Sequence, residues 1–337
     1  MKVHLFVKQG TSPSPVLRRL LEQADCVRYV TGREEVASVA EGTTLFAQDG
    51  LGDLVEKCPG TQFAKCCNYY VIKNIVNCPM RCSYCYLHTF SQDDFITVNC
   101  DINRIYRALT TMSKTRSLRV GTGEYSDSMA LEAYTGYTRL LTDFAAHHPH
   151  ILFEFKTKYT RAAPYANPGA AIIYGVTLEP QDTIDREEQG TASLAERIDF
   201  LCRAAEKNNQ VALHFDPIVD LPGALRAGRK TMDDISRRIS QEAVAYISLG
   251  GFRYSKGFAA VLLARYPGSR LLNGEFVRCR DHKYRYPREK RVHLFRQWVA
   301  MIRTVYPKAP VYLCMENAWV WQRVFHDMPS FSSHLFT

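Results

Sequence analysis

The sequence predicts an α/β fold in which six strand–helix units form a partial, TIM-like barrel. Apolar runs of strand length alternate with helix-like stretches through the middle of the chain, and this alternation is typical of βαβ units with parallel strands. Six units are fewer than the eight that close a barrel. The expected strands span residues 69–77, 118–124, 151–158, 171–178, 211–215 and 245–249.

The flanks of this core differ from it, and they divide the chain into three predicted segments. Residues 1–62 open with a strand-like run and then a helix and a second strand, which predicts a small N-terminal α/β appendage. Residues 63–255 hold the barrel, and residues 256–337 form a mainly helical C-terminal extension. The expected helices span residues 16–23, 128–146, 193–207, 258–264 and 291–305. The flanking strand-like runs lie at 1–8 and 26–30, and the C-terminal extension closes on the run 311–316.

Composition indicates a cytoplasmic protein with a sizeable core. The chain has 337 residues, and 46% of them are hydrophobic. No run of about 18 apolar residues occurs, so we expect no membrane span. The first residues lack the apolar stretch of a secretory signal peptide. Eleven cysteines without such a signal argue against a disulfide framework and favour a reducing compartment.

Three closely spaced cysteines are the strongest local signal in the chain. Cys78, Cys82 and Cys85 lie within eight residues, with three and then two residues between them. Thiolates select iron–sulfur clusters, zinc or copper(I). A structural zinc site and most electron-transfer clusters need four protein ligands. Three thiolates can instead hold a 4Fe–4S cluster and leave one iron open to an outside ligand.

A zinc site is the competing interpretation of the same loop. His88 follows Cys85 by three positions, so the three cysteines and His88 could form a Cys3His knuckle. Zinc ligands usually come as two pairs separated by a longer loop, and no second spaced pair is obvious. Cys66 and Cys67 are adjacent and are more typical of buried thiols. Ligand number and spacing therefore favour the cluster over zinc.

Polar residues follow the predicted strands at their carboxyl ends. In parallel α/β folds the reactive groups gather at this edge, so these side chains are candidates for one site. The cysteine loop follows the first strand. The other candidates are Glu124 after the second strand, Lys156 and Lys158 at the third, Glu179 after the fourth, and His214 with Asp216 at the fifth.

A basic segment lies between residues 278 and 291. It holds seven Lys or Arg against Asp281 and Glu289, within a chain whose formal net charge is +9. Tyrosines alternate with the cations, a pattern that suits phosphate contacts combined with stacking on bases. A solvated loop before a helix is the alternative. The predicted nucleic-acid contacts are Lys283, Tyr284, Arg285, Tyr286 and Arg288.

The cysteine loop resembles the radical S-adenosylmethionine (SAM) superfamily and, within it, the spore photoproduct lyase family. Its Tyr84-Cys85-Tyr86-Leu87 run goes beyond what the general superfamily motif requires. Further similar runs follow the predicted strands, so that the resemblance covers residues 63–255. They are Ser126-Asp127, Lys156-Thr157-Lys158 and the stretches 176–180, 190–198 and 214–218. The basic segment falls roughly where that family has a DNA-engaging hairpin.

This resemblance implies the radical SAM type of barrel and a definite reaction. A 4Fe–4S cluster on Cys78, Cys82 and Cys85 would cleave SAM reductively to methionine and a 5′-deoxyadenosyl radical. The radical would take a hydrogen atom from a thymine dimer photoproduct in DNA, and the bond between the thymines would break. The protein's task is to position SAM against the lesion and to exclude water. The implied partners are damaged DNA and an electron donor such as flavodoxin or ferredoxin, and we expect a monomer.

The resemblance also implies roles for single residues. The Gly121-Thr122-Gly123-Glu124 run is similar to the superfamily's Gly-Gly-Glu element, in which backbone and carboxylate hold the methionine amine. Lys158 is the candidate for the SAM carboxylate or ribose, with Lys156 as its competitor. The implied SAM contacts are Gly121, Gly123, Glu124, Ser126, Lys158 and Thr177, and the implied catalytic residues are Tyr84, Tyr86 and Cys314.

One departure from the family pattern concerns the hydrogen donor. The family's lyases carry a donor cysteine just before the element that matches Ser126-Asp127, and this chain has Glu124 and Tyr125 there. The candidates for a different donor are Cys314, Cys100, Tyr84 and Tyr86. Two alternatives stay open: a radical SAM enzyme of this family with another substrate, such as a modified nucleotide or a peptide, and a zinc-stabilised nucleic-acid-binding protein.

Overall fold

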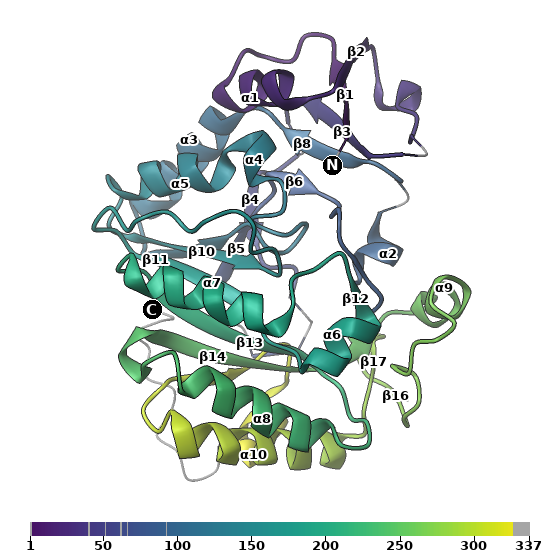
Figure 1. Cartoon of the computed structure of the whole chain (residues 1–337), viewed down its shortest axis with the longest axis vertical. Helices are drawn as coiled ribbons and strands as arrows, with labels where there is room; N and C mark the ends of the chain where they lie inside the picture. Colours follow the sequence, from purple (N-terminus) through teal and green to yellow (C-terminus); the bar gives the residue numbers. More distant parts are fainter. Residues whose placement is uncertain are drawn as a thin grey trace. The chain divides into compact units, whose positions relative to one another are not determined.

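In the computed structural model the chain forms two compact units, and Figure 1 labels helices and strands along the chain. It describes residues 2–39, 41–50, 52–60, 63–65, 67–91 and 93–325. Unit 1 comprises Met1–Cys58, Tyr69–Pro79 and Ser91–Ile172, and unit 2 comprises Pro59–Asn68, Met80–Phe90 and Ile173–Thr337. The units cut across the segments 1–62, 63–255 and 256–337, whose boundaries stay a prediction. Residues 326–337 of the predicted extension lie outside the described residues.

The first sheet of unit 1 confirms the predicted strand–helix–strand start of the chain. Helix α1 (Pro15–Gln23) follows the first strand; Ser14 caps it by accepting a 3.0 Å hydrogen bond from the Leu17 N–H. The sheet is parallel except at its last strand, and it takes two strands from beyond residue 62. In spatial order its strands are β2 (Cys26–Val30), β1 (Val3–Lys8), β3 (Thr43–Gln48), β8 (Ile96–Asn99) and β6 (Ile75–Val76).

The second group of strands in unit 1 contains three strands of the predicted barrel. β5 (Tyr69–Ile72), β9 (Leu118–Gly121) and β10 (Ile151–Thr157) are parallel, and β4 (Val55–Lys57) pairs antiparallel with β5. The expected single strand 69–77 is wrong, because the backbone changes partners within it. The Lys73 N–H donates to the Leu54 carbonyl, and the Asn74 carbonyl accepts from the Asn99 N–H in the first sheet.

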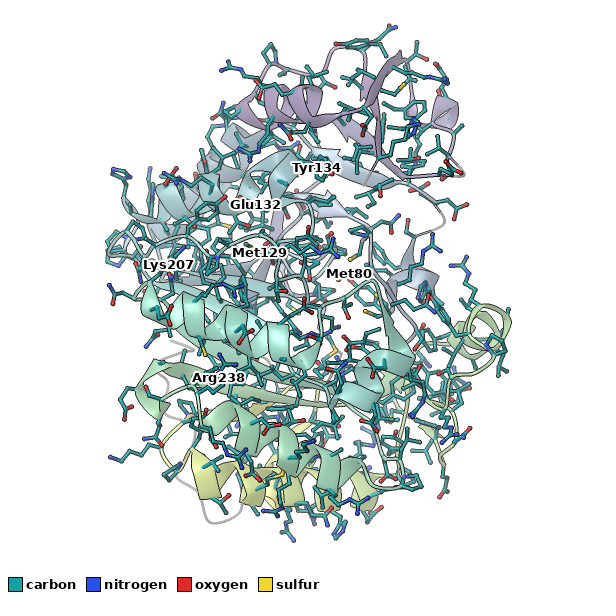
Figure 2. The ribbon with its side chains drawn as sticks, in the orientation of Figure 1. Met80, Met129, Glu132, Tyr134, Lys207 and Arg238 are labelled. Atoms are coloured by element: carbon teal, nitrogen blue, oxygen red, sulfur yellow. The ribbon has the colours of Figure 1, made fainter. Side chains whose placement is uncertain are left out.

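The helical part of unit 1 corrects one prediction. The expected helix 128–146 is two helices, α4 (Glu132–Thr135) and α5 (Tyr137–Ala145), because Gly136 between them has a φ of +65°. The Glu132 carboxylate, labelled in Figure 2, accepts from the N–H groups of Thr138 (2.8 Å) and Arg139 (3.0 Å), so it caps α5. The remaining helices are η1 (Arg33–Glu35) and α3 (Ile102–Ser113).

Unit 2 is built on four parallel strands. These are β11 (Ile172–Thr177), β13 (Gln210–Ile218), β14 (Val244–Gly251) and β18 (Val311–Leu313). The first three confirm the expected strands at 171–178, 211–215 and 245–249. The apolar run 311–316, predicted to close the C-terminal extension, supplies the fourth. Because the strands are parallel, the residues after Thr177, Ile218, Gly251 and Leu313 share one edge.

Helices follow the strands of unit 2 as expected. The predicted helix 193–207 is confirmed as α7 (Leu194–Glu206), which begins with a reciprocal capping box between Ser193 and Glu196. The predicted helices 258–264 and 291–305 are α9 (Phe258–Arg265) and α10 (Arg288–Val305). The others are α2 (Leu87–Phe90), α6 (Gln181–Glu187), α8 (Ala224–Ser236), η2 (Gln241–Ala243) and α11 (Ala318–Val324).

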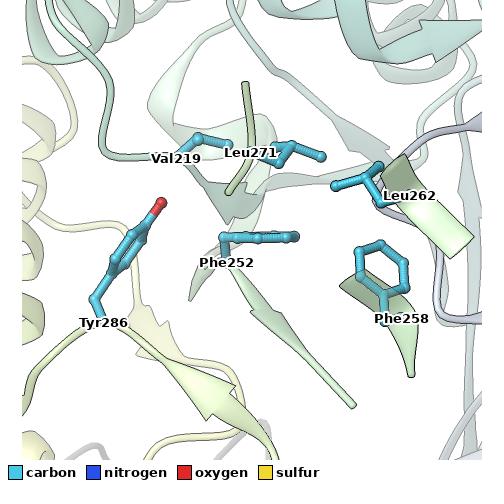
Figure 3. Packing of buried hydrophobic residues seen from close by; sticks show 6 residues of the cluster. All are labelled: Val219, Phe252, Phe258, Leu262, Leu271 and Tyr286. Atoms are coloured by element: carbon cyan, nitrogen blue, oxygen red, sulfur yellow. The ribbon is translucent and has the colours of Figure 1, made fainter. Parts of the chain in front are cut away.

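Two small antiparallel sheets complete unit 2. One joins β7 (Arg81–Cys82) to β12 (Glu188–Gln189), and the other has the order β15 (Arg253–Tyr254), β17 (Tyr284–Arg285) and β16 (Val277–Arg278). Beside the second sheet, one buried cluster joins the end of β13, α9 and the basic segment (Figure 3). Its members are Val219, Phe252, Phe258, Leu262, Leu271 and Tyr286. Among the described residues no helix combines the length and the apolar character needed to span a membrane.

Candidate active site

The cysteine loop is held in unit 2 by a short antiparallel strand pair. Glu188 of β12 lies opposite Cys82 of β7, and Gln189 lies opposite Arg81. The Cys85 N–H donates to the Cys82 carbonyl over 3.1 Å, so Cys82 and Cys85 lie on one tight turn. Cys82 is buried and Cys85 is half-buried. The pairing with β12 therefore fixes the backbone that presents these two thiols.

Two buried glutamates support the loop from the end of α6. Ser83 donates its N–H to the Glu187 carbonyl (2.8 Å) and its hydroxyl to the Glu187 carboxylate. Ser269 donates to the same carboxylate over 2.8 Å. Tyr84 donates its hydroxyl to Glu188. Burial and the negative charge of Glu188 raise the pKa of Tyr84 well above its usual value, so this phenol stays protonated and acts as a donor.

Arg197 completes this network from α7. Its guanidinium forms an ion pair with Glu188, and both side chains are fully buried. It also donates to the carbonyls of Ala192 (2.9 Å) and Thr177 (2.9 Å). Thr177 ends β11, so Arg197 joins the carboxyl end of a parallel strand to the strand that clamps the cysteine loop.

The donor set of the loop fits an iron–sulfur cluster in its chemistry. Cys78, Cys82 and Cys85 offer three thiols within eight residues, and no disulfide joins the cysteines that the structure describes. Within the described ranges, no three Cys, His, Asp or Glu side chains converge on a common metal position. Cys78 belongs to unit 1 and the other two cysteines to unit 2. We therefore assign ligands by donor chemistry and derive no cluster geometry.

His88, the fourth ligand of the zinc alternative, makes contacts within unit 2. Its Nε2 atom lies 2.9 Å from the Cys82 carbonyl oxygen and 3.3 Å from the Tyr266 hydroxyl. Burial lowers the pKa of His88, which favours the neutral ring. Of the adjacent pair predicted to be buried thiols, Cys67 is half-buried and Cys66 lies outside the described residues.

The glycine element of unit 1 lies where the ends of β9 and β10 approach closely. A Cβ atom on Gly121 would lie 1.7 Å from the Tyr69 hydroxyl oxygen and 2.7 Å from the Glu154 carbonyl oxygen. A Cβ atom on Gly123 would lie 2.7 Å from the Lys156 Cβ. Both positions therefore need glycine, because any larger residue would push the strand ends apart.

Asp127 organises the loop that follows β9. It is buried, and it accepts from the N–H groups of Met129 (2.9 Å; labelled in Figure 2) and Lys158 (2.6 Å) and from the Thr157 hydroxyl (2.7 Å). Burial raises the pKa of Asp127, although these hydrogen bonds partly offset the rise. Asp127 thus joins the glycine element to the predicted SAM contact Lys158 at the end of β10.

Ser126 has a buried hydroxyl without a protein partner. Its side chain is 5% exposed, and its Oγ atom forms no hydrogen bond to any described residue. A buried hydroxyl without a partner is unfavourable, so such a group indicates a ligand or an ordered water. Ser126 therefore fits the predicted contact to a polar cofactor, and the half-buried Glu124 lies two residues before it.

Tyr125 occupies the position where the resemblance implied a hydrogen-donating cysteine. Its hydroxyl donates to Glu56 over 2.6 Å, and Lys73 lies 2.9 Å from the same carboxylate. Burial by itself would raise the pKa of Glu56, but the hydrogen bonds from Tyr125 and Lys73 lower it overall. The phenol of Tyr125 is therefore engaged in a structural triad within unit 1.

The family-model comparison identifies the chain. The model of the spore photoproduct lyase family matches residues 51–314, which is most of the sequence. This chain belongs to the spore photoproduct lyase family. A comparison with curated proteins gives no match.

Solved structures of spore photoproduct lyase share the fold. The complex with dinucleoside spore photoproduct is 19% identical to this chain, with a TM-score of 0.79, and the match covers 93% of this chain and 99% of the other. A double mutant with bound AdoMet and dinucleoside spore photoproduct gives the same identity, coverage and TM-score. This likeness confirms the predicted partial barrel of the radical SAM type.

The candidates for the missing hydrogen donor lie in different environments. Cys314 is half-buried after β18, and its N–H donates to the Leu249 carbonyl over 2.7 Å. Cys100 is fully buried behind β8, and burial raises its pKa to about 12. Tyr86 is 38% exposed and packs against Phe90. Both cysteines directly follow a strand, and Cys314 is the more accessible of the two.

The predicted nucleic-acid segment forms a hairpin of β16 and β17. Tyr284 stacks on Tyr254, with ring centres 5.1 Å apart, and the exposed Arg288 lies 4.8 Å from the Trp319 ring centre. Arg285 is buried in an ion pair with Asp281 at 2.7 Å. Tyr286 is only 1% exposed, and its hydroxyl accepts from the Asp220 N–H. Because Arg285 and Tyr286 are buried and bind other parts of the protein, the proposed DNA contacts are now Lys283, Tyr284 and Arg288.

Sequence reasoning missed the residues that support the site. It noted that the run 190–198 is similar to the family but assigned no role to Glu187, Glu188 or Arg197. It also missed Arg253, which lies 3.1 Å from the Asp216 carboxylate beside the end of β13. The local signal was that Arg197 lies on the apolar face of the predicted helix, next to Ile198, where a buried side chain is expected. A charged residue at a helix position that faces the core is rarely buried without a partner, so this pattern could have predicted the buried role of Arg197.

Proposed function

We propose that this chain is a radical SAM enzyme that repairs a thymine dimer photoproduct in DNA. The observation that carries the proposal is the three-cysteine loop within a sequence that matches the spore photoproduct lyase family over residues 51–314. A solved spore photoproduct lyase double mutant holds bound AdoMet and dinucleoside spore photoproduct. When bound, the cluster supplies the electron that cleaves SAM. We further propose that the protein works in the cytoplasm as a monomer.

The chain's own residues have separable tasks in this proposal. Glu187 and Glu188 hold the loop that presents Cys82 and Cys85, and Arg197 neutralises Glu188. Backbone groups at Gly121 and Gly123, together with Glu124, Ser126, Lys158 and Thr177, supply the proposed polar contacts to SAM. Cys314 and Tyr84 are the proposed hydrogen donors, because Tyr86 is exposed at the surface, and the proposed DNA contacts are Lys283, Tyr284 and Arg288.

A second candidate function is a radical SAM reaction on a different substrate. The observation that favours it is the position before Ser126, where Glu124 and Tyr125 replace the donor cysteine. The Tyr125 hydroxyl already donates to Glu56, so it is a poor replacement for a mobile thiol. Residues at the site decide the chemistry more than the fold does.

One experiment separates these functions. The protein is reconstituted anaerobically, and 5′-deoxyadenosine is measured with and without ultraviolet-irradiated oligonucleotide, together with the remaining dimer. Stimulated SAM cleavage with loss of the dimer supports repair. SAM cleavage with an unchanged dimer supports the second candidate. A colourless protein with one zinc and no iron would contradict both and favour a zinc-stabilised nucleic-acid-binding protein.

A further inference from the structure

Three large exposed hydrophobic side chains come from two helices, α2 and α9, and from the residue before α2. Among the described residues of unit 2, Tyr86 and Phe90 at α2 are 38% and 52% exposed, and Leu263 on α9 is 62% exposed. The rings of Tyr86 and Phe90 are 5.8 Å apart. Helices α2 and α9 contact each other, and Figure 1 shows them side by side. Exposed apolar side chains on two helices that contact each other form a candidate interaction site.

Helix α9 is apolar on the side that faces away from the core. Its inner side chains, Phe258 and Leu262, pack in the buried cluster of Figure 3. Its outer side presents Leu263 next to the exposed Ala264. An amphipathic surface helix normally carries polar residues on that outer side. The exposed apolar side of α9 is therefore available to a partner.

The two chain segments that carry these side chains are basic. Segments 80–90 and 253–270 together contain five Lys or Arg and no Asp or Glu. Four of these cations, Arg81, Lys256, Arg265 and Arg270, are exposed. A patch of one charge raises the association rate of an oppositely charged partner and rejects partners of like charge. The partner that fits is acidic.

Direct contacts join this surface to the cysteine loop. The Nε2 atom of His88 in α2 lies 2.9 Å from the Cys82 carbonyl oxygen and 3.3 Å from the hydroxyl of Tyr266, which ends α9. Thr89 Oγ1 lies 3.2 Å from Ser255 Oγ.

We propose that Arg81, Tyr86, Phe90, Lys256, Leu263 and Arg265 form a docking surface, the α2–α9 surface, for a small acidic protein that carries one electron. This inference rests on the proposed function, because that function needs an external reductant. One electron leaves the reduced carrier and enters the oxidised cluster on the adjacent loop; no covalent bond forms or breaks in this transfer. Transient redox partners combine a small apolar contact with complementary charge, which is the composition of this surface.

A nucleic acid fits the same surface less well. Phosphate contacts would use its cations, but Leu263 and the edge-on pair of Tyr86 and Phe90 would add little to them. The hairpin of β16 and β17 already offers tyrosine and arginine side chains for that purpose. We therefore assign the α2–α9 surface to a protein partner and make DNA an outcome of the test.

The test compares two double charge reversals that change the net charge equally. Lys256→Glu/Arg265→Glu alters the α2–α9 surface, and Arg226→Glu/Arg229→Glu alters exposed arginines on α8 as the control. Binding of flavodoxin, the acidic probe, is measured by calorimetry at low and high salt. We expect the first variant to bind flavodoxin about tenfold more weakly, with a smaller salt dependence, and the control to match the wild type. Leu263→Ser should also weaken binding without changing the salt dependence.

Activity adds an independent measurement. Flavodoxin-driven formation of 5′-deoxyadenosine should fall about tenfold in Lys256→Glu/Arg265→Glu, while dithionite-driven formation keeps the wild-type rate. The proposal would be overturned if the wild type did not bind flavodoxin, or if the two charge-reversal variants bound it equally. It would also be overturned if Lys256→Glu/Arg265→Glu lost binding to irradiated DNA but bound flavodoxin as the wild type does. If dithionite yields no 5′-deoxyadenosine from iron-loaded wild type, the proposed function fails, and the calorimetric difference still decides the docking surface.

Discussion

Arg197 and Glu188 form an ion pair in which neither side chain is exposed to solvent. Glu188 also accepts from the Tyr84 hydroxyl and lies opposite Cys82 in the β7–β12 pairing. The pair therefore lies directly behind the loop that carries two of the proposed cluster ligands. A charge buried without its partner is strongly unfavourable, so the loop depends on Arg197.

Replacing Arg197 with methionine should destabilise the protein by about 3–5 kcal/mol, because Glu188 would stay buried without a compensating charge. Urea unfolding at neutral pH measures the change. The control is Arg237→Ala, which breaks an exposed pair with Asp234 and should change the unfolding free energy by less than about 1 kcal/mol. Equal effects of the two variants would show that the buried pair has no special role.

Single replacement of Cys78, Cys82 or Cys85 by alanine should remove the iron and the brown colour of anaerobically reconstituted protein, because three thiolates are the minimum donor set. Iron and sulfide analysis measures the loss. Cys279→Ala, which removes a half-buried thiol from the hairpin, serves as the matched control and should keep wild-type iron. Retention of iron in a loop variant would contradict the ligand assignment.

Gly121→Ala should destabilise unit 1 by about 1–3 kcal/mol, because the new methyl group would overlap the Tyr69 hydroxyl. The double variant Gly121→Ala/Tyr69→Phe removes that hydroxyl and should recover part of the lost stability. The recovery should be incomplete because the Glu154 carbonyl oxygen would still lie 2.7 Å from the new Cβ atom. Thermal unfolding of the single and double variants measures this coupling. Purely additive effects would place the clash elsewhere.

Ser126→Ala should separate folding from cofactor binding. Without SAM the variant should be as stable as the wild type or slightly more stable, because it removes a buried hydroxyl that has no protein partner. Its affinity for SAM should fall about tenfold, which corresponds to one lost hydrogen bond. Equilibrium dialysis with labelled SAM measures the affinity. Unchanged SAM binding would assign the Ser126 hydroxyl to an ordered water.

The Asp281–Arg285 pair predicts a pH dependence of stability. Burial by itself would raise the pKa of Asp281, but the hydrogen bonds and charge of Arg285 lower it below the usual value of 3.8. A lowered pKa in the folded state stabilises the protein above the unfolded-state pKa, and this contribution disappears as the pH falls through the folded-state value. Asp281→Asn should therefore be less stable than the wild type near neutral pH, and the difference should shrink below about pH 4. Urea unfolding across this range measures the trend; a constant difference would contradict it.

The fold class could be predicted because it depends on local pattern. Apolar runs of strand length at 151–158 and 211–215 became β10 and β13 because side-chain alternation and burial are set by neighbouring residues. The Ser193–Glu196 capping box fixed the start of α7 for the same reason. Local pattern failed at residue 73, where the backbone leaves one sheet for another. It also failed at Gly136, whose left-handed conformation divides a predicted helix.

The sequence by itself determined the three thiols, the glycine element and the family resemblance, because each is a spacing within a short stretch of chain. Only the tertiary structure decided what supports them. The Tyr84–Glu188 hydrogen bond joins residues 104 positions apart, and Tyr125 meets Glu56 from 69 positions away. The tertiary structure also decided that Arg285 and Tyr286 are buried and that the outer side of α9 is exposed. Such contacts depend on which strands pair and which loops close, and no local spacing encodes them.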